Sequence, residues 1–78
     1  MKMAIVEWID STFKHDWQLD EEIKSTSPNK CISAGFLNER EDCVQIIQSI
    51  TKNSKADVIA IPKVAIKRIR YLRIRNGK

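Results

Sequence analysis

The sequence has few of the residues that form catalytic sites, metal sites or covalent cross-links. Its 78 residues include two cysteines, two glycines and one histidine. Cys31 and Cys43 are too far apart for a C-x-x-C pair, and His15 has no partner at metal-ligand spacing. Two glycines also exclude a glycine-rich phosphate loop. We therefore predict a non-enzymatic protein without metal or cofactor, in which the cysteines are small, reduced core residues.

Long apolar runs are also missing. No segment approaches the ~20 apolar residues that a membrane helix needs. The first ten residues, MKMAIVEWID, do not form a signal peptide, because Glu7 and Asp10 interrupt a short apolar run. We expect a cytoplasmic protein that does not interact with membranes.

The last part of the chain contains no acidic residue. Residues 1–57 contain seven Lys/Arg and ten Asp/Glu, whereas residues 58–78 contain seven Lys/Arg and no Asp/Glu. Such an asymmetry favours an anionic partner, with nucleic acid ahead of other anions. The alternative is a solvated basic strand that keeps the protein soluble.

The block from Cys31 to Thr51 predicts two strands joined by the polar turn NERED, residues 38–42. Gly35 lies inside the first strand, and a glycine there usually marks a bend or a close backbone approach. The second strand is rich in β-branched residues. A bent central hairpin in so short a chain predicts a sheet that curls into a small barrel.

Further elements are expected on both sides of this hairpin. Apolar residues predict strands over 3–9 and 58–61. A short helix is predicted from Asp16, its N-cap, to Lys24, and two turns of helix must dock on the sheet to be stable. We assign Trp8 and Trp17 mainly to the core, because a small barrel needs large apolar anchors.

The pattern of residues 63–75 is compatible with either a strand or a helix. Alternating basic and apolar residues favour a strand over 67–74, after a one-turn connector at 63–66. Pro62 and the three-residue spacing of Ile66, Ile69 and Leu72 fit a helix instead. With the strand, which we favour, the chain is mainly β and forms one domain over 1–78, with residues 76–78 frayed. The predicted fold is a small five-stranded SH3/Sm-like barrel with one short helix between strands one and two.

Residues 31–70 resemble the Sm-like family, which includes bacterial Hfq. Gly35, Leu37, an acidic turn and the run Val44-Gln45-Ile46 are similar to the family's first motif, and Ile61–Ile66 is similar to its second. The resemblance implies a strongly bent barrel that forms rings through its edge strands. It also implies that Gln45 and Lys63 contact RNA.

A second resemblance covers nearly the whole chain. The patterns VEW-x-D, DW…EE, C-x-x-x-GFL and IPK-x-AI resemble a group of small bacteriophage proteins. This resemblance implies expression in the cytoplasm of a bacterial host, and it implies no activity.

The basic C-terminal run is the strongest functional candidate. One tyrosine among several arginines suits a stacking platform flanked by phosphate contacts, although Ile69 and Tyr71 are equally good core residues. The predicted nucleic-acid-binding residues are Gln45, Lys63, Lys67, Arg68, Arg70, Tyr71, Arg73 and Arg75.

We thus predict a protein that binds RNA or another single-stranded nucleic acid, with a homo-oligomer as a further expectation. The alternative is an accessory module that binds and modulates a host protein, with Asp16–Glu22 or an edge strand as its contact.

Overall fold

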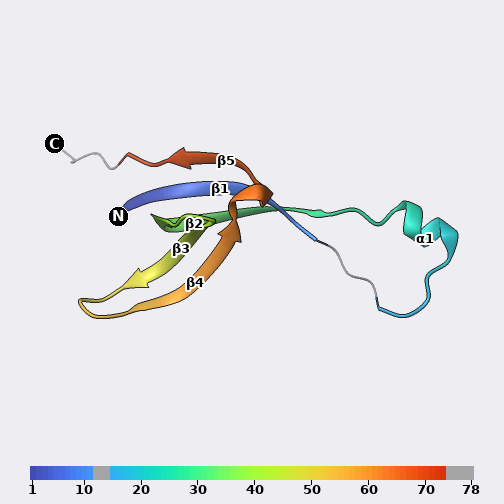
Figure 1. Ribbon diagram of the computed structural model, residues 1–78, viewed down its shortest axis with the longest axis horizontal. Coiled ribbons are helices and arrows are strands. Elements are labelled where there is room, and N and C mark those ends of the chain that lie inside the picture. The colour runs from blue at the N-terminus through green and yellow to red at the C-terminus, as the bar shows by residue number, and fades with distance from the viewer. Residues whose placement is uncertain (12–14, 74–78) are drawn as a thin grey trace.

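The computed structural model describes residues 1–11 and 15–73 and is mainly β, with five antiparallel strands in one sheet (Figure 1). One short α-helix and one 3₁₀ turn complete the described elements, so the predicted mainly β class is confirmed. In chain order, the elements are β1 (Lys2–Asp10), α1 (Asp20–Lys24), β2 (Asn29–Glu39), β3 (Cys43–Ile50), β4 (Lys55–Pro62), η1 (Lys63–Ala65) and β5 (Ile66–Tyr71).

The strand order is β4-β3-β2-β1-β5, which places two consecutive strands, β4 and β5, at opposite edges. The 3₁₀ turn η1 connects them, and its Lys63 N–H donates to the Asp42 carbonyl at 3.0 Å. No ladder joins β4 to β5 among the described residues, so the sheet is not closed into the barrel that we predicted. Both edge strands keep one side of their backbone unpaired within the sheet.

Strand β2 changes partners along its length. Residues 29–37 pair with β1, and residues 36–39 pair with β3. Gly35 is buried just before β3 begins to pair. A Cβ atom at Gly35 would lie 2.7 Å from the Ile47 carbonyl oxygen and 2.9 Å from Cγ2 of Ile46. The expected close backbone approach at this glycine is therefore confirmed, whereas the expected hairpin over the full length of β2 was wrong.

The main core cluster lies on one face of the bent sheet, and Ile47, which follows Ile46 in β3, is buried on the other face. Its fully buried side chains come from β1, β3 and β4, and Leu37 of β2 is 7% exposed. Trp8 packs against this cluster, and its indole N–H donates to the Ser33 hydroxyl at 3.0 Å. The buried cluster consists of Ala4, Val6, Leu37, Val44, Ile46 and Ile61. The prediction that Trp8 belongs to the core is confirmed.

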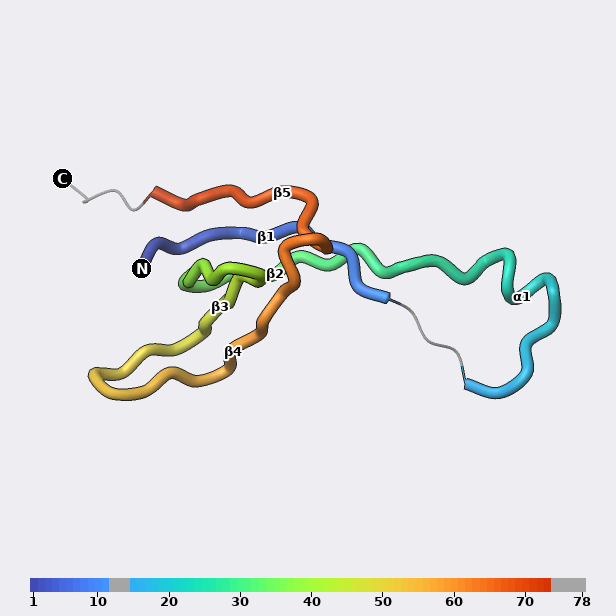
Figure 2. The backbone as a smooth tube through the Cα atoms, viewed as in Figure 1, coloured from blue at the N-terminus to red at the C-terminus, as the bar shows by residue number. Residues whose placement is uncertain are grey.

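Residues 15–28, between β1 and β2, form an arm that projects from the sheet and includes α1 (Figures 1 and 2). The helix begins at Asp20 rather than Asp16, because Leu19 is extended (φ −69°, ψ 153°) and is the N-cap, while Asp16 has a left-handed φ of 67°. It does not dock on the sheet, and Trp17 is 100% exposed, so both packing predictions were wrong. The radius of gyration of 16.6 Å reflects this arm, since a compact chain of this length has a value of roughly 11.5 Å.

The C-terminal segment adopts the strand alternative. The connector at 63–66 is the turn η1, and the strand that follows runs from Ile66 to Tyr71. Leu72 continues alongside β1, with its N–H donating to the Met3 carbonyl at 2.8 Å. The predicted strand over residues 67–74 is confirmed through Tyr71, while Arg75 and the predicted frayed end lie outside the described residues.

Candidate nucleic-acid interface on the β5 edge

Strand β5 brings the basic side chains together at one edge of the sheet. Its register with β1 places Ile69 opposite Val6, on the core face, and Arg68 opposite Glu7, on the other face. Because side chains alternate along a strand, Arg70 lies on the same face as Arg68. We call this second face the outer face. On β5, β1 and β2, it carries Ile5, Glu7, Ile9, Lys30, Ile32, Arg68 and Arg70.

A single carboxylate partly neutralises the arginines of the outer face. Oε2 of Glu7 accepts from Nε and Nη2 of Arg68 at 2.9 and 2.7 Å. The same oxygen lies 3.7 Å from Nη2 of Arg70. Both arginine side chains are more than half exposed, whereas the Glu7 side chain is 32% exposed. The three side chains form a cluster that keeps a positive charge and faces solvent.

Three further predicted residues belong to the same edge. Lys67 lies at a bulge where the β1–β5 register shifts between Glu7 and Trp8. Tyr71 is 54% exposed, and Nζ of Lys2 lies 5.7 Å from its ring centroid, in cation–π range. Arg73 is exposed just beyond the strand. The edge therefore combines four cationic side chains, from Lys67 to Arg73, with one accessible aromatic ring.

The side chains of Gln45 and Lys63 form their contacts with residues outside the β5 edge. Nζ of Lys63 is 2.9 Å from Oε2 of Glu39, at the acidic turn between β2 and β3. The Gln45 side-chain oxygen accepts from Nδ2 of Asn38 at 2.8 Å. Both side chains thus have partners within the chain, next to a turn that also contains Glu41 and Asp42. This arrangement is a poorer anion site than the β5 edge.

Sequence reasoning missed three residues of the outer face, namely Glu7, Lys30 and Ile32. Alternation along the strand predicted over 3–9 puts Ile5, Glu7 and Ile9 on one face, which is the signal that could have found Glu7. The partners of this face come from pairing with β2 and β5, which are far away in sequence. No local pattern predicts those ladders.

Comparison of the chain with known protein families, with curated proteins and with solved structures found no match. Within residues 1–11 and 15–73, no three His, Cys, Asp or Glu side chains are grouped so that they could hold a metal ion. No helix in the same part of the chain has the length and apolar character needed to cross a membrane. Function therefore has to be inferred from the geometry of the β5 edge.

Proposed function

We propose that the protein binds single-stranded nucleic acid, RNA or DNA, along the β5 edge. The observation that carries this proposal is the row of Lys67, Arg68 and Arg70 along one open strand, with Arg73 just beyond its end and Glu7 as the only carboxylate described in contact with them. Phosphates supply most of the affinity of such interfaces through Lys and Arg contacts. An exposed tyrosine at the end of the strand adds a ring on which a base can stack.

Replacing Glu7 with glutamine tests this proposal by a gain of affinity. The substitution keeps the size of the side chain and removes the charge that pairs with Arg68 and Arg70. One additional free cation should strengthen binding of a labelled single-stranded oligonucleotide about fivefold at about 0.1 M salt. The loss of exposed ion pairs should cost at most about 1 kcal/mol of stability. Fluorescence anisotropy measures the affinity.

Glu39→Gln is the matched control for this measurement. It frees Lys63 at the acidic turn in the same way that Glu7→Gln frees the two arginines. We expect its oligonucleotide affinity to stay within about twofold of the wild type, since the β5 edge is unchanged. A gain of affinity in Glu39→Gln with none in Glu7→Gln would move the site to the acidic turn and contradict the proposal.

We also infer that the open sheet is a variant of the small SH3/Sm-like barrel. Three features support this inference: the strand order, the 3₁₀ turn between β4 and β5, and the bond from Lys63 to Asp42 that ties this turn to the β2–β3 connection. The free edges of β4 and β5 and a surface of 6730 Å² support self-association in solution. A monomer of 9.0 kDa typically exposes roughly 4,900 Å².

The arm supports a second candidate function, docking on a host protein. Trp17, Leu19 and Ile23 are 100%, 71% and 57% exposed, and four acidic side chains accompany them between residues 16 and 22. This chemistry suits an apolar groove rimmed by Lys and Arg on the partner.

Trp17→Ser separates the two functions. Because the Trp17 side chain is wholly exposed, the change should alter stability by less than about 0.5 kcal/mol. It should remove any host protein captured from a nuclease-treated lysate and leave oligonucleotide affinity unchanged. Capture that survives Trp17→Ser would exclude the arm as the contact, and thermal unfolding provides the stability control.

A further inference from the structure

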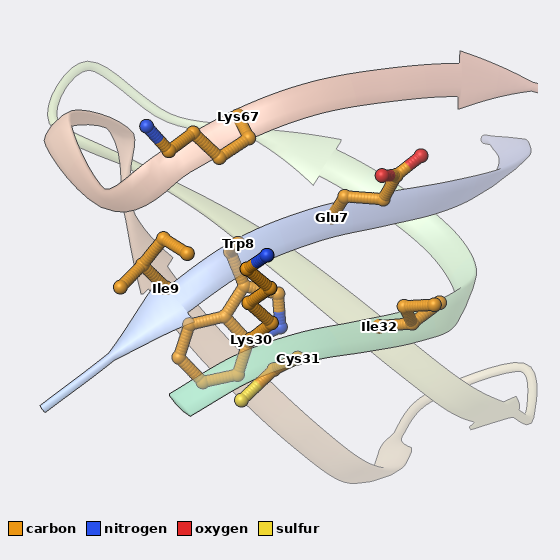
Figure 3. A pocket seen from close by; sticks show the side chains of 7 residues that line it. All are labelled: Glu7, Trp8, Ile9, Lys30, Cys31, Ile32 and Lys67. Atoms are coloured by element: carbon orange, nitrogen blue, oxygen red, sulfur yellow. The ribbon is translucent and has the colours of Figure 1, made fainter. Parts of the chain in front are cut away.

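A cavity of about 350 Å³ opens where β1, β2 and β5 meet (Figure 3). Its lining includes two apolar residues, Ile9 and Ile32, and two cationic residues, Lys30 and Lys67. The register places Glu7, Ile9, Lys30 and Ile32 on the outer face. Trp8 and Cys31, which pair on the core face, complete the lining. The cavity adjoins the arginines of the β5 edge through Glu7, which lines it and contacts Arg68 and Arg70.

The bulge in the β1–β5 ladder accounts for this hollow. Arg68 pairs with Glu7 and Ile66 pairs with Trp8, so Lys67 has no partner of its own on β1. A bulge bends the strand and redirects a side chain, and such features are frequent beside binding sites. Here the redirected side chain is Lys67, which lines the cavity.

The charges in the cavity favour an anion. Neither Lys30 nor Lys67 forms an ion pair in the described part of the chain. The acidic lining residue, Glu7, already binds Arg68 and Arg70. Ile32 is 72% exposed, although it lies in the middle of a paired strand. Two free ammonium groups beside an exposed apolar wall suit a ligand with an apolar face and a negative charge.

We propose that this cavity receives one unpaired base of a bound single strand, with the neighbouring phosphates on Lys30 and Lys67. This inference rests on the proposed function and adds a base-contacting subsite to the β5 edge. The volume is at the lower limit for small-ligand sites, which fits one base. Bases in a duplex are stacked and paired, so only a single strand can supply a base to the cavity. The cavity thus favours single-stranded over duplex nucleic acid, because its apolar walls need an unpaired base, whereas both forms offer the same phosphate charge.

Ile32→Ser tests the subsite, with Val64→Ser as its control. Val64 is 97% exposed in η1 and does not line the cavity, so both changes remove an exposed aliphatic side chain. We expect Ile32→Ser to weaken binding of a thymidine oligonucleotide about fivefold, at the low end of what a base contact contributes. The slope of log affinity against log salt should stay unchanged. Val64→Ser should bind like the wild type.

A strand without bases provides a second measurement that needs no variant. Wild-type protein should bind an abasic oligonucleotide of equal length about fivefold more weakly than the thymidine strand. Lys30→Gln should weaken binding of both strands and reduce the salt slope by about 0.7. Equal affinity for the two strands, or for Ile32→Ser and the wild type, would overturn the subsite and leave the β5 interface intact. Failure of the wild type to bind either strand would overturn both proposals.

Discussion

Replacing Gly35 with valine is expected to prevent stable folding. A Cβ at this position would lie 2.7 Å from the carbonyl oxygen of Ile47 and 2.9 Å from Cγ2 of Ile46. The first of these atoms belongs to the backbone of β3, so it cannot move without disturbing the β2–β3 ladder. Overpacking a core costs about 1–3 kcal/mol, and a backbone clash adds to that cost. For a chain of 78 residues with a small core, a loss of about 3 kcal/mol or more removes most of its stability.

Urea unfolding followed by circular dichroism measures this effect. Ala34→Val is the matched control, because Ala34 is the exposed neighbour of Gly35 in the same strand. Valine favours strands, so the control should keep the wild-type midpoint or raise it slightly. Soluble Gly35→Val protein with the wild-type midpoint would show that β2 and β3 do not approach each other as closely as the structure describes.

Neutralising Arg68, Arg70 and Arg73 together should remove most of the affinity for single-stranded nucleic acid. Each phosphate contact contributes about 0.7 to the salt slope for a single strand, so three contacts contribute about 2. At about 0.1 M salt, this corresponds to a loss of about 100-fold in affinity. The three arginines are exposed, and the ion pairs of Arg68 and Arg70 with Glu7 lie at the surface, so the triple glutamine variant should still fold.

A second triple variant controls for net charge. Lys24, Lys52 and Lys55 are exposed, and they lie in α1, in the β3–β4 turn and at the start of β4. Their replacement by glutamine lowers the net charge by the same amount and leaves the β5 edge intact. We expect the affinity of this control for single-stranded nucleic acid to fall less than about tenfold, because only long-range electrostatics changes. Equal losses in the two variants would indicate attraction by overall charge and no defined interface.

The elements that could be predicted from the sequence are those set by local pattern. Alternating basic and apolar residues predicted β5, and Gly35 predicted the close approach of β2 to β3. The expected helix start at Asp16 was wrong because the chain is still extended at Leu19, so the first turn begins only at Asp20. Trp17 was assigned to the core from its size, but its side chain is 100% exposed on an arm that projects from the sheet.

The candidate site was predictable only where local sequence pattern determines it. The cationic residues of β5 were visible in composition, whereas Glu7, Lys30 and Ile32 join them only through strand pairing. The ladder between β1 and β5 links residues 58 to 67 positions apart in the chain. Gln45 and Lys63 were included because of a family resemblance, and their contacts with Asn38 and Glu39 leave them less available than the arginines.

The most direct test of the β5 interface is a titration of labelled protein with a short single-stranded oligonucleotide, followed by amide chemical shifts. The interface predicts the largest shifts in residues 67–73 and at Glu7 and Ile32, which face the same surface. Residues 15–24 of the arm and the β3–β4 turn should stay unchanged. Shifts concentrated on the arm or around Gln45 and Lys63, with residues 67–73 unaffected, would contradict nucleic-acid binding on the β5 edge.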